Sequence, residues 1–169
     1  KHSKELLAKA FEVTENILQD VKNVEIKPNG KLYVTTNSGV HHPLTELSDA
    51  YLSLFSWTGD MMMQLFENYS HLSDPTKGSG IVIVDEIGLH MHPTAQRKIV
   101  DWLKEKYPKL QFIVSSHSPF IAQAAKEGEI FVLENKGGKT NLKPYDDSFR
   151  GWPIEEVFTN VFQMKTTRD

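Results

Sequence analysis

The stretch IVIVDEIGLHMHP, residues 81–93, decides the fold of this chain. It opens with four consecutive β-branched apolar residues, a pattern typical of a parallel strand that is buried on both faces. Two acids, Asp85 and Glu86, end this run, and a His-x-His pair, His90 and His92, follows before a proline. The stretch therefore predicts either a metal site or the acidic end of a nucleotide-hydrolysing strand.

The composition is that of one soluble globular domain. Of 169 residues, 39% are hydrophobic and 24% are charged, and there is no cysteine, which excludes disulfides and thiolate zinc sites. The formal net charge of -3 offers no basic surface for nucleic acid, so we expect DNA or RNA contacts only through other domains. No apolar stretch approaches membrane-spanning length and no signal peptide is visible. We therefore expect a cytoplasmic protein that does not enter a membrane.

Helical and extended patterns alternate along the chain. Before the opening stretch we expect an amphipathic helix over 4–21, a hairpin that turns at Asn29-Gly30, a loop over 37–46 and a long helix over 48–69. Ser48 is well suited as the N-cap of that long helix. The chain begins without a methionine, already inside a helical pattern, and it stops without a turn or cap. We therefore expect a fragment of a longer polypeptide.

Beyond a polar linker at 71–80, the pattern changes to strand, helix and strand. We expect a strand over 81–85, a helix from Pro93 to about Tyr107 and a second buried strand over 111–116. A helix near Pro119, a hairpin around the NKGG turn and a short helix at Pro153 complete the pattern. This βαβ order is typical of an α/β fold with a parallel sheet.

Reactive side chains follow both buried strands. Asp85 and Glu86 come after the first strand, and His117 comes after the second. Because ligands collect beyond the carboxyl ends of parallel strands, neighbouring strands would bring these three side chains to one edge. Phosphoryl transfer needs such a set, with a carboxylate for magnesium, a base for water and a donor for the γ-phosphate. The alternative is structural, with acids that solvate a strand end and a histidine that caps the next helix.

Three segments together resemble the ABC-type ATPase head, the class of the SMC, RecF-like and OLD ATPases. The opening stretch resembles the Walker B strand and D-loop of that class, including the LHLHP-like tail of the OLD and RecF-like branch. ELSDAYLSLFSW (46–57) resembles its signature segment, and FIVSSHSPF (112–120) resembles its switch-histidine strand and turn. The three occur in family order over roughly residues 44–134.

The resemblance implies a fold and a domain. The fold would be an incomplete α/β subdomain of a parallel-sheet P-loop NTPase, with an N-terminal helix and hairpin added. Residues 1–169 would be the C-terminal part of an ABC-type ATPase domain, whose Walker A part lies outside this chain. Within it, the signature segment would occupy about 44–69, the Walker B strand and D-loop 81–93, and the switch histidine position 117.

The resemblance also implies roles for individual residues. Asp85 would hold Mg²⁺, usually through water, Glu86 would be the general base for the attacking water, and His117 would contact the γ-phosphate of ATP. Ser48, Asp49 and Ala50 would bind ATP in trans, at the γ-phosphate of an opposed head. A helix N-terminus suits an anion there, but Asp49-Ala50 replaces the Gly-Gly of many members, and a side chain at Ala50 restricts close backbone approach.

A phosphate loop requires G-x-x-x-x-G-K-[ST] between a strand and a helix. The nearest match is Gly138-Lys139-Thr140, but its leading glycine would fall on Leu133, and a polar strand follows in place of a helix. We interpret this segment as a hairpin turn. The Walker A part is therefore expected elsewhere in the protein, and we expect this chain alone to be inactive.

The implied partners are a second ATPase head, in a homodimer or higher oligomer, and a nuclease effector. The tail LHMHP points by resemblance to anti-phage ATPases of the OLD, Septu or retron-associated kind, or to DNA-repair relatives. Two alternatives remain open. One is a metal-dependent hydrolase or nuclease that uses the two acids and three histidines Asp85, Glu86, His90, His92 and His117. The other is a non-catalytic interaction module.

Overall fold

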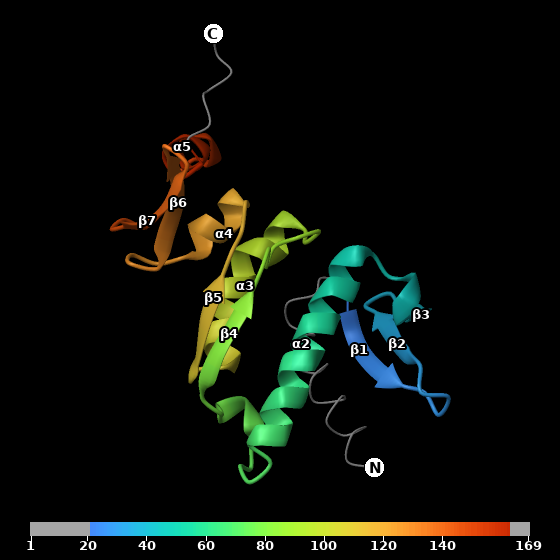
Figure 1. Cartoon of the computed structure of the whole chain (residues 1–169). Helices are drawn as coiled ribbons and strands as arrows, with labels where there is room; N and C mark the ends of the chain where they lie inside the picture. The colour runs from blue at the N-terminus through green and yellow to red at the C-terminus, as the bar shows by residue number, and fades with distance from the viewer. Residues whose placement is uncertain (1–20, 163–169) are drawn as a thin grey trace.

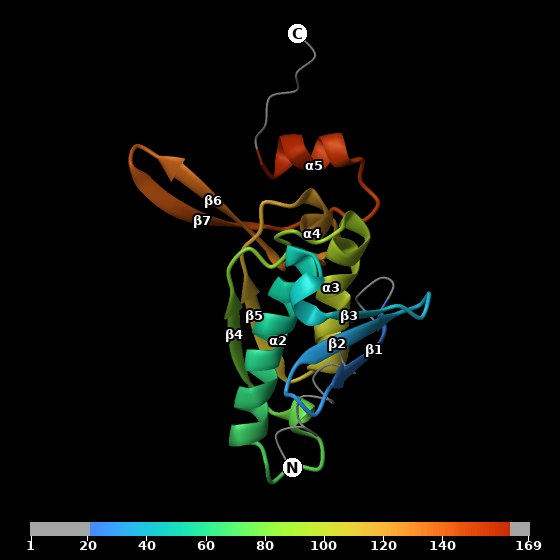
Figure 2. The same cartoon turned by 90° about the vertical axis from the view of Figure 1, so that its right-hand side faces the viewer.

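The computed structural model describes residues 21–162. The helix expected over 4–21 therefore lies almost entirely outside the described residues. Figures 1 and 2 show three parts in chain order: a small antiparallel sheet, a central unit of strands and helices, and a C-terminal hairpin with a short helix. No helix among the described residues is long and apolar enough to cross a membrane.

The first sheet is antiparallel, with strand order β1-β2-β3. β1 (Val21–Ile26) and β2 (Leu32–Thr36) form the expected hairpin, and Gly30 at its turn has a φ of +80°. Glycine adopts this conformation without steric cost, and Asn29 Oδ1 accepts a hydrogen bond from Lys31 N at 3.0 Å. The prediction of a hairpin here is confirmed.

The expected loop over 37–46 is only partly a loop. Its residues His41–Pro43 form a short third strand, β3, which pairs antiparallel with β2. Thr35 Oγ1 and His41 Nδ1 lie 3.0 Å apart across the pair. The backbone of this segment thus pairs with the edge of β2 over only three residues. No local sequence pattern predicts so short a strand. A 3-10 turn, η1 (Leu44–Glu46), then leads into the long helix.

The long helix, α2 (Asp49–Asn68), begins and ends within one residue of its predicted bounds. Its apolar side chains serve two separate cores. Phe55 packs with the β1–β2 hairpin, whereas Leu54, Met62 and Leu65 belong to the larger central core. α2 therefore connects the small sheet to the central unit.

The central unit is the predicted βαβ arrangement. β4 (Gly80–Val84) follows a second 3-10 turn, η2 (Pro75–Lys77), and pairs in parallel with β5 (Leu110–Val114). α3 (Pro93–Lys106) connects the two strands, with Pro93 in its first turn, where no backbone N–H is needed. In Figure 2, α2 and α3 lie on the same side of these strands.

One expectation about these strands is wrong for the described residues. Both faces of the β4–β5 sheet are apolar, but only the inner face, with Val82, Val84 and Phe112, packs into the central core. On the outer face Ile81 and Ile83 are 65% and 77% exposed. The apolar run correctly predicts a parallel strand, but no described residue buries its second face.

The central core closes around Tyr107, the residue that follows α3. Its side chain is fully buried, and its hydroxyl donates a hydrogen bond to Met62 Sδ at 3.3 Å. Burial, together with the nearby charge of Asp74, raises the pKa of this phenol well above its usual range. The rings of Trp102 and Phe112 meet it edge-on, a favourable aromatic geometry. α3 is thereby held against β5.

The C-terminal part begins with α4 (Pro119–Ala124) and continues into an antiparallel hairpin of β6 (Ile130–Lys136) and β7 (Lys139–Tyr145). The turn of this hairpin is Gly137-Gly138, and both glycines have positive φ. The GKT sequence therefore lies at a hairpin turn, as predicted, with Gly138 in the turn and Lys139 and Thr140 at the start of β7. α5 (Ile154–Asn160) follows, after Pro153.

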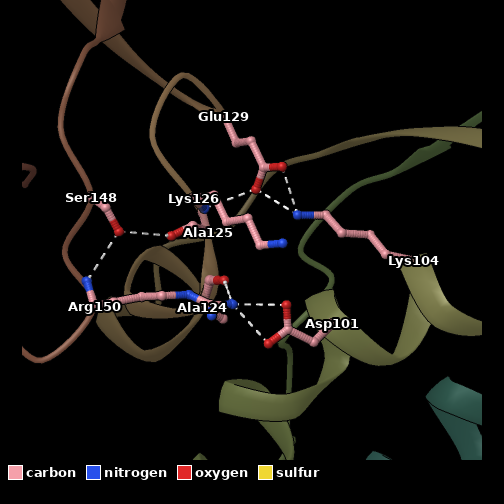
Figure 3. A network of polar contacts seen from close by, with 8 residues as sticks. All are labelled: Asp101, Lys104, Ala124, Ala125, Lys126, Glu129, Ser148 and Arg150. Atoms are coloured by element: carbon pink, nitrogen blue, oxygen red, sulfur yellow. Dashed lines mark hydrogen bonds and ion pairs between the residues drawn. The ribbon is translucent and has the colours of Figure 1, made fainter.

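Two ion pairs fasten this C-terminal part to α3 (Figure 3). Arg150 Nη2 contacts both carboxylate oxygens of Asp101 at 2.7 Å and also donates to the carbonyl of Ala124 at 3.0 Å. Lys104 Nζ contacts Glu129 at 2.6 Å. All four side chains are partly exposed, so these pairs orient the hairpin more than they stabilise the fold.

Candidate functional site

The carboxyl ends of β4 and β5 lie side by side. The strands pair in register from Gly80 with Leu110 to Val84 with Val114, and Ser115 N donates to the Val84 carbonyl at 3.0 Å. The residues after each strand therefore leave the sheet at the same edge. The structure thus brings together the two acids and the histidine that the sequence predicts to meet there.

Ser115 joins the two strand ends through its side chain. Its hydroxyl donates a hydrogen bond to Asp85 Oδ1 and accepts one from Glu86 N at 2.9 Å. Its carbonyl accepts a bond from Ile87 N at 3.1 Å. Three bonds from one residue fix the direction in which Asp85 and Glu86 leave β4. Sequence reasoning missed Ser115, because the second strand was expected over 111–116 and Ser115 was counted within it, whereas β5 ends at Val114.

Glu86 and His117 face each other across this edge. Glu86 Oε1 lies 3.2 Å from His117 Nε2, and the Glu86 side chain is 33% exposed whereas that of His117 is 87% exposed. A carboxylate accepts a proton, and an imidazole nitrogen can donate a hydrogen bond to it. The pair is therefore a base and a donor at hydrogen-bond distance, open to a ligand in solvent.

The backbone of Glu86 is strained. Its φ is +53°, in the left-handed region that side chains other than glycine rarely adopt. Such a conformation costs of order 1–3 kcal/mol and persists only where the surroundings enforce it. Here the bond from Glu86 N to Ser115 Oγ and the bond from Leu89 N to the Glu86 carbonyl enforce it. Strain of this kind concentrates at functional sites.

His90 and His92 take separate places in the loop after Glu86. His90 has a φ of +62°, and His92 is the N-cap residue of α3, where its Nδ1 accepts a hydrogen bond from Thr94 N at 3.3 Å. Within residues 21–162, no three His, Asp or Glu side chains lie close enough together to hold a metal ion. The structure therefore does not assemble the five-residue metal site of the alternative hypothesis.

Ser48, Asp49 and Ala50 lie at the start of α2. Ser48 occupies the predicted N-cap position with extended backbone, but its hydroxyl makes no capping hydrogen bond. Figures 1 and 2 both draw this helix end at the same end of the molecule as the end of β4. Among the described residues, no hydrogen bond or ion pair joins these three residues to the edge formed by Asp85, Glu86 and His117.

Comparison with known families identifies one domain type. Residues 43–122 match the family model AAA_21, described as "AAA domain, putative AbiEii toxin, Type IV TA system". The matched segment begins at the last residue of β3, includes α2 and the whole βαβ unit, and ends within α4. It therefore contains every residue of the candidate site.

Curated relatives and solved structures point to the same class. A Septu protein PtuA of Bacillus mycoides is 32% identical over 120 residues, which are 70% of this chain and 16% of that protein. The "Retron Vc95 probable ATPase" of Vibrio cholerae is 31% identical over 123 residues, 72% of this chain and 24% of that protein. Over this segment the chain is therefore similar to part of these ATPase-related proteins. It spans only 16–24% of the length of these two relatives.

The fold of this chain also occurs in SMC proteins. A structure from work on ATP-driven dimerization and DNA-stimulated activation of SMC ATPases superposes with a TM-score of 0.70. The superposition covers 97% of this chain and 95% of the other at 13% identity. At that identity the likeness supports the fold alone. The parallel-sheet α/β fold inferred from the sequence is thus confirmed.

Proposed function

We propose that this chain supplies the acidic edge of an ATP site in a dimeric ABC-type ATPase head. One observation carries the proposal: Glu86 and His117 meet at 3.2 Å at the carboxyl ends of two parallel strands. ATP hydrolysis needs a base for water beside a donor for the γ-phosphate, and this edge provides both in an open position.

Each side chain of this edge would have its own role. Asp85, whose carboxylate is oriented by the Ser115 hydroxyl, would hold Mg²⁺ through water. The bound Mg²⁺ would neutralise charge that develops on the phosphates. Glu86 would orient and deprotonate the attacking water, and the exposed imidazole of His117 would donate to the γ-phosphate.

Ser48, Asp49 and Ala50 would act in trans, on ATP held by a second head. The helix α2 is 20 residues long, so its first turn offers unpaired N–H groups and the positive end of a dipole. The Ser48 hydroxyl is not used for capping and could therefore contact a phosphate. The Cβ of Ala50 would hold the backbone slightly farther from the ligand than glycine would. The assembly would be a homodimer or a higher oligomer.

The Walker A part of the protein would cover the outer face of the β4–β5 sheet. Parallel sheets are covered on both faces in stable domains, yet Ile81, Ile83 and Ile113 are at least half exposed here. A further strand-bearing part, with the phosphate loop, would bury these side chains and bring the loop to the same edge as Glu86.

The relatives suggest the setting in which such a head works. Their names include a Septu protein and retron ATPases, so we propose a role in phage defence, with DNA repair as the alternative setting. The head would gate an attached effector, for example a nuclease, and other domains would provide any contact with DNA or RNA.

The test is Glu86→Gln in the polypeptide or complex that carries both this chain and its phosphate loop. We expect ATP turnover to fall by about 10²–10⁴-fold, the usual contribution of a general base. ATP should remain bound and the dimer should become more populated, as measured by nucleotide retention and light scattering. Glu105→Gln, at an exposed glutamate in the last turn of α3, is the matched control and should leave turnover unchanged.

Three outcomes would contradict the proposal. Undiminished turnover of the Glu86→Gln protein would exclude Glu86 as the base. Biological activity that survives Glu86→Gln, with no ATP turnover by the wild type, would indicate a non-catalytic module. Hydrolysis of another substrate that stops when metal ions are chelated and does not depend on ATP would indicate a metal-dependent hydrolase.

A further inference from the structure

A chain of hydrogen bonds behind the acidic edge joins three segments that are distant in the sequence. Gln96, on α3, donates from Nε2 to the carbonyl of Gly88 at 2.7 Å. Its Oε1 accepts a bond from the Ser118 hydroxyl at 2.6 Å. The Ser118 hydroxyl in turn accepts a bond from Phe120 N at 3.2 Å and so caps α4. Gln96 is thus the central link.

The two ends of this chain carry the two groups of the proposed site. Gly88 lies two residues after Glu86 in the same turn, and Ser118 directly follows His117. The turn is compact, because Leu89 N donates to the Glu86 carbonyl at 2.9 Å and Met91 N donates to the Gly88 carbonyl at 3.1 Å. Gln96 therefore connects the turn that holds the base with the turn that holds the histidine.

The chemistry of this link requires an amide. The Gly88 carbonyl, which also accepts from Met91 N, takes a second hydrogen bond here and so calls for a donor, whereas the Ser118 hydroxyl donates and calls for an acceptor. A glutamine side chain supplies both from one planar group, whereas a carboxylate only accepts and a thioether does neither well. Gln96 is half-buried, so its hydrogen bonds are partly screened from water.

Packing at Gly88 leaves little freedom around the link. A Cβ added at Gly88 would lie 3.2 Å from Ile121 Cγ1 on α4 and 3.3 Å from Gln96 Nε2. The turn therefore approaches both α3 and α4 closely. A small displacement of the Gln96 amide would be transmitted to the backbone next to Glu86.

We propose that Gln96 is a positioning residue for ATP hydrolysis, which sets the distance between the Glu86 carboxylate and the His117 imidazole by tying Gly88 to Ser118. The inference rests on the proposed ATPase function. It assigns Gln96 no contact with ATP or water. Loss of the Gln96 side chain should therefore lower the rate of the catalytic step and leave nucleotide binding intact, since displacement of a catalytic group by about 1 Å can cost about 10²-fold in rate.

The chain offers a matched control in Gln123, on α4. Gln123 is also half-buried, and its Nε2 also donates to a backbone carbonyl at 2.7 Å, that of Trp152. This bond fastens the C-terminal part and does not involve the turns of Glu86 or His117. Gln123→Met thus removes an equivalent bond at a position without the proposed role.

The experiment compares Gln96→Met, Gln96→Glu and Gln123→Met in the protein that contains the phosphate loop. We expect kcat of Gln96→Met to fall by about 10–100-fold with ATP affinity within about twofold of wild type. Gln123→Met should keep the wild-type kcat. Turnover of Gln96→Glu should rise toward wild type as the pH is lowered, because a protonated carboxyl can again donate to Gly88, whereas Gln96→Met should show no such recovery.

Failure of this inference is distinguishable from failure of the ATPase proposal. If Glu86→Gln abolishes turnover but Gln96→Met matches wild type or Gln123→Met, Gln96 does not position the site. The inference would also be overturned if Gln96→Met lost kcat only in step with a loss of thermal stability and Gln96→Glu showed no recovery of turnover at low pH. If the wild-type protein does not turn over ATP, the proposed function itself fails.

Discussion

The two faces of the β4–β5 sheet share a composition but not an environment. On the inner face, Val82, Val84 and Phe112 pack against the core built by α2 and α3. On the outer face, Ile81 and Ile83 remain mostly exposed among the described residues. This contrast supports our proposal that the described residues are one half of a layered domain. The inner face is covered and stabilises the fold, and the rest of the proposed ATPase site would attach at the outer face.

The largest expected effect lies on the inner side. Ile99 of α3 is fully buried in the central core, so Ile99→Ala should lower the free energy of unfolding by about 2–5 kcal/mol. Ile83→Ala, on the outer face, should change it by less than about 0.5 kcal/mol in this chain alone. Chemical denaturation of the two variants measures the difference. Equal losses would mean that the two faces do not differ as described.

A smaller effect should appear on the outer face once the phosphate-loop part is present. Burying Ile83 there would contribute about 1.5–3 kcal/mol, so Ile83→Asp should weaken association of the two parts by at least about tenfold. Titration of the separately expressed parts measures this. Leu142→Asp, at an exposed leucine of the β6–β7 hairpin, is a comparison variant at a second apolar surface. Unchanged association of Ile83→Asp would place the missing part elsewhere.

The turn after β4 contains two residues with strained backbone, and relief of this strain should stabilise the chain. His90→Gly and Glu86→Gly each relieve a positive φ and should each raise stability by about 0.5–1 kcal/mol. Only Glu86→Gly should abolish ATP turnover in the complete protein. Thermal melts and turnover assays on both variants separate strain from chemistry. Destabilisation by His90→Gly would show that the conformation is not strained.

The smallest effect concerns the link to the C-terminal part. Partial burial alone would raise the pKa of Glu129, but hydrogen bonds from Lys104 and Lys126 N outweigh it and lower this pKa below its usual value. A lowered carboxyl pKa stabilises the fold above the unfolded pKa, and this contribution is lost as the pH falls through the folded pKa. Glu129→Gln should therefore destabilise the chain slightly at pH 7 and not at pH values below that carboxyl pKa. Denaturation midpoints at both pH values test this.

Much of the fold could be predicted because its signals are local. The β-branched run before Asp85, the proline at the start of α3 and the Asn29-Gly30 turn each specify their element without help from distant residues. The short strand at His41–Pro43 could not be predicted, since only its pairing with β2 makes it a strand. The exposure of Ile83 could not be predicted either. An apolar sequence indicates that a strand face favours burial, but it does not indicate which residues bury that face.

The candidate site shows the same division. Two strand ends with acids and a histidine were enough to predict that Asp85, Glu86 and His117 share an edge, because parallel strands end together. The residues that connect them were missed. Ser115 and Gln96 act through hydrogen bonds to partners that are 30 and 22 positions away, and a serine or glutamine alone carries no signal of such a partner.

The most direct test of the central claim is ATP turnover by this chain alone and by the protein that also contains the phosphate loop, each with and without Glu86→Gln. We expect no meaningful turnover by the chain alone, clear turnover by the complete protein and loss of that turnover on Glu86→Gln. Robust, Glu86-dependent turnover by the chain alone, or turnover by the complete protein that survives Glu86→Gln, would contradict the claim.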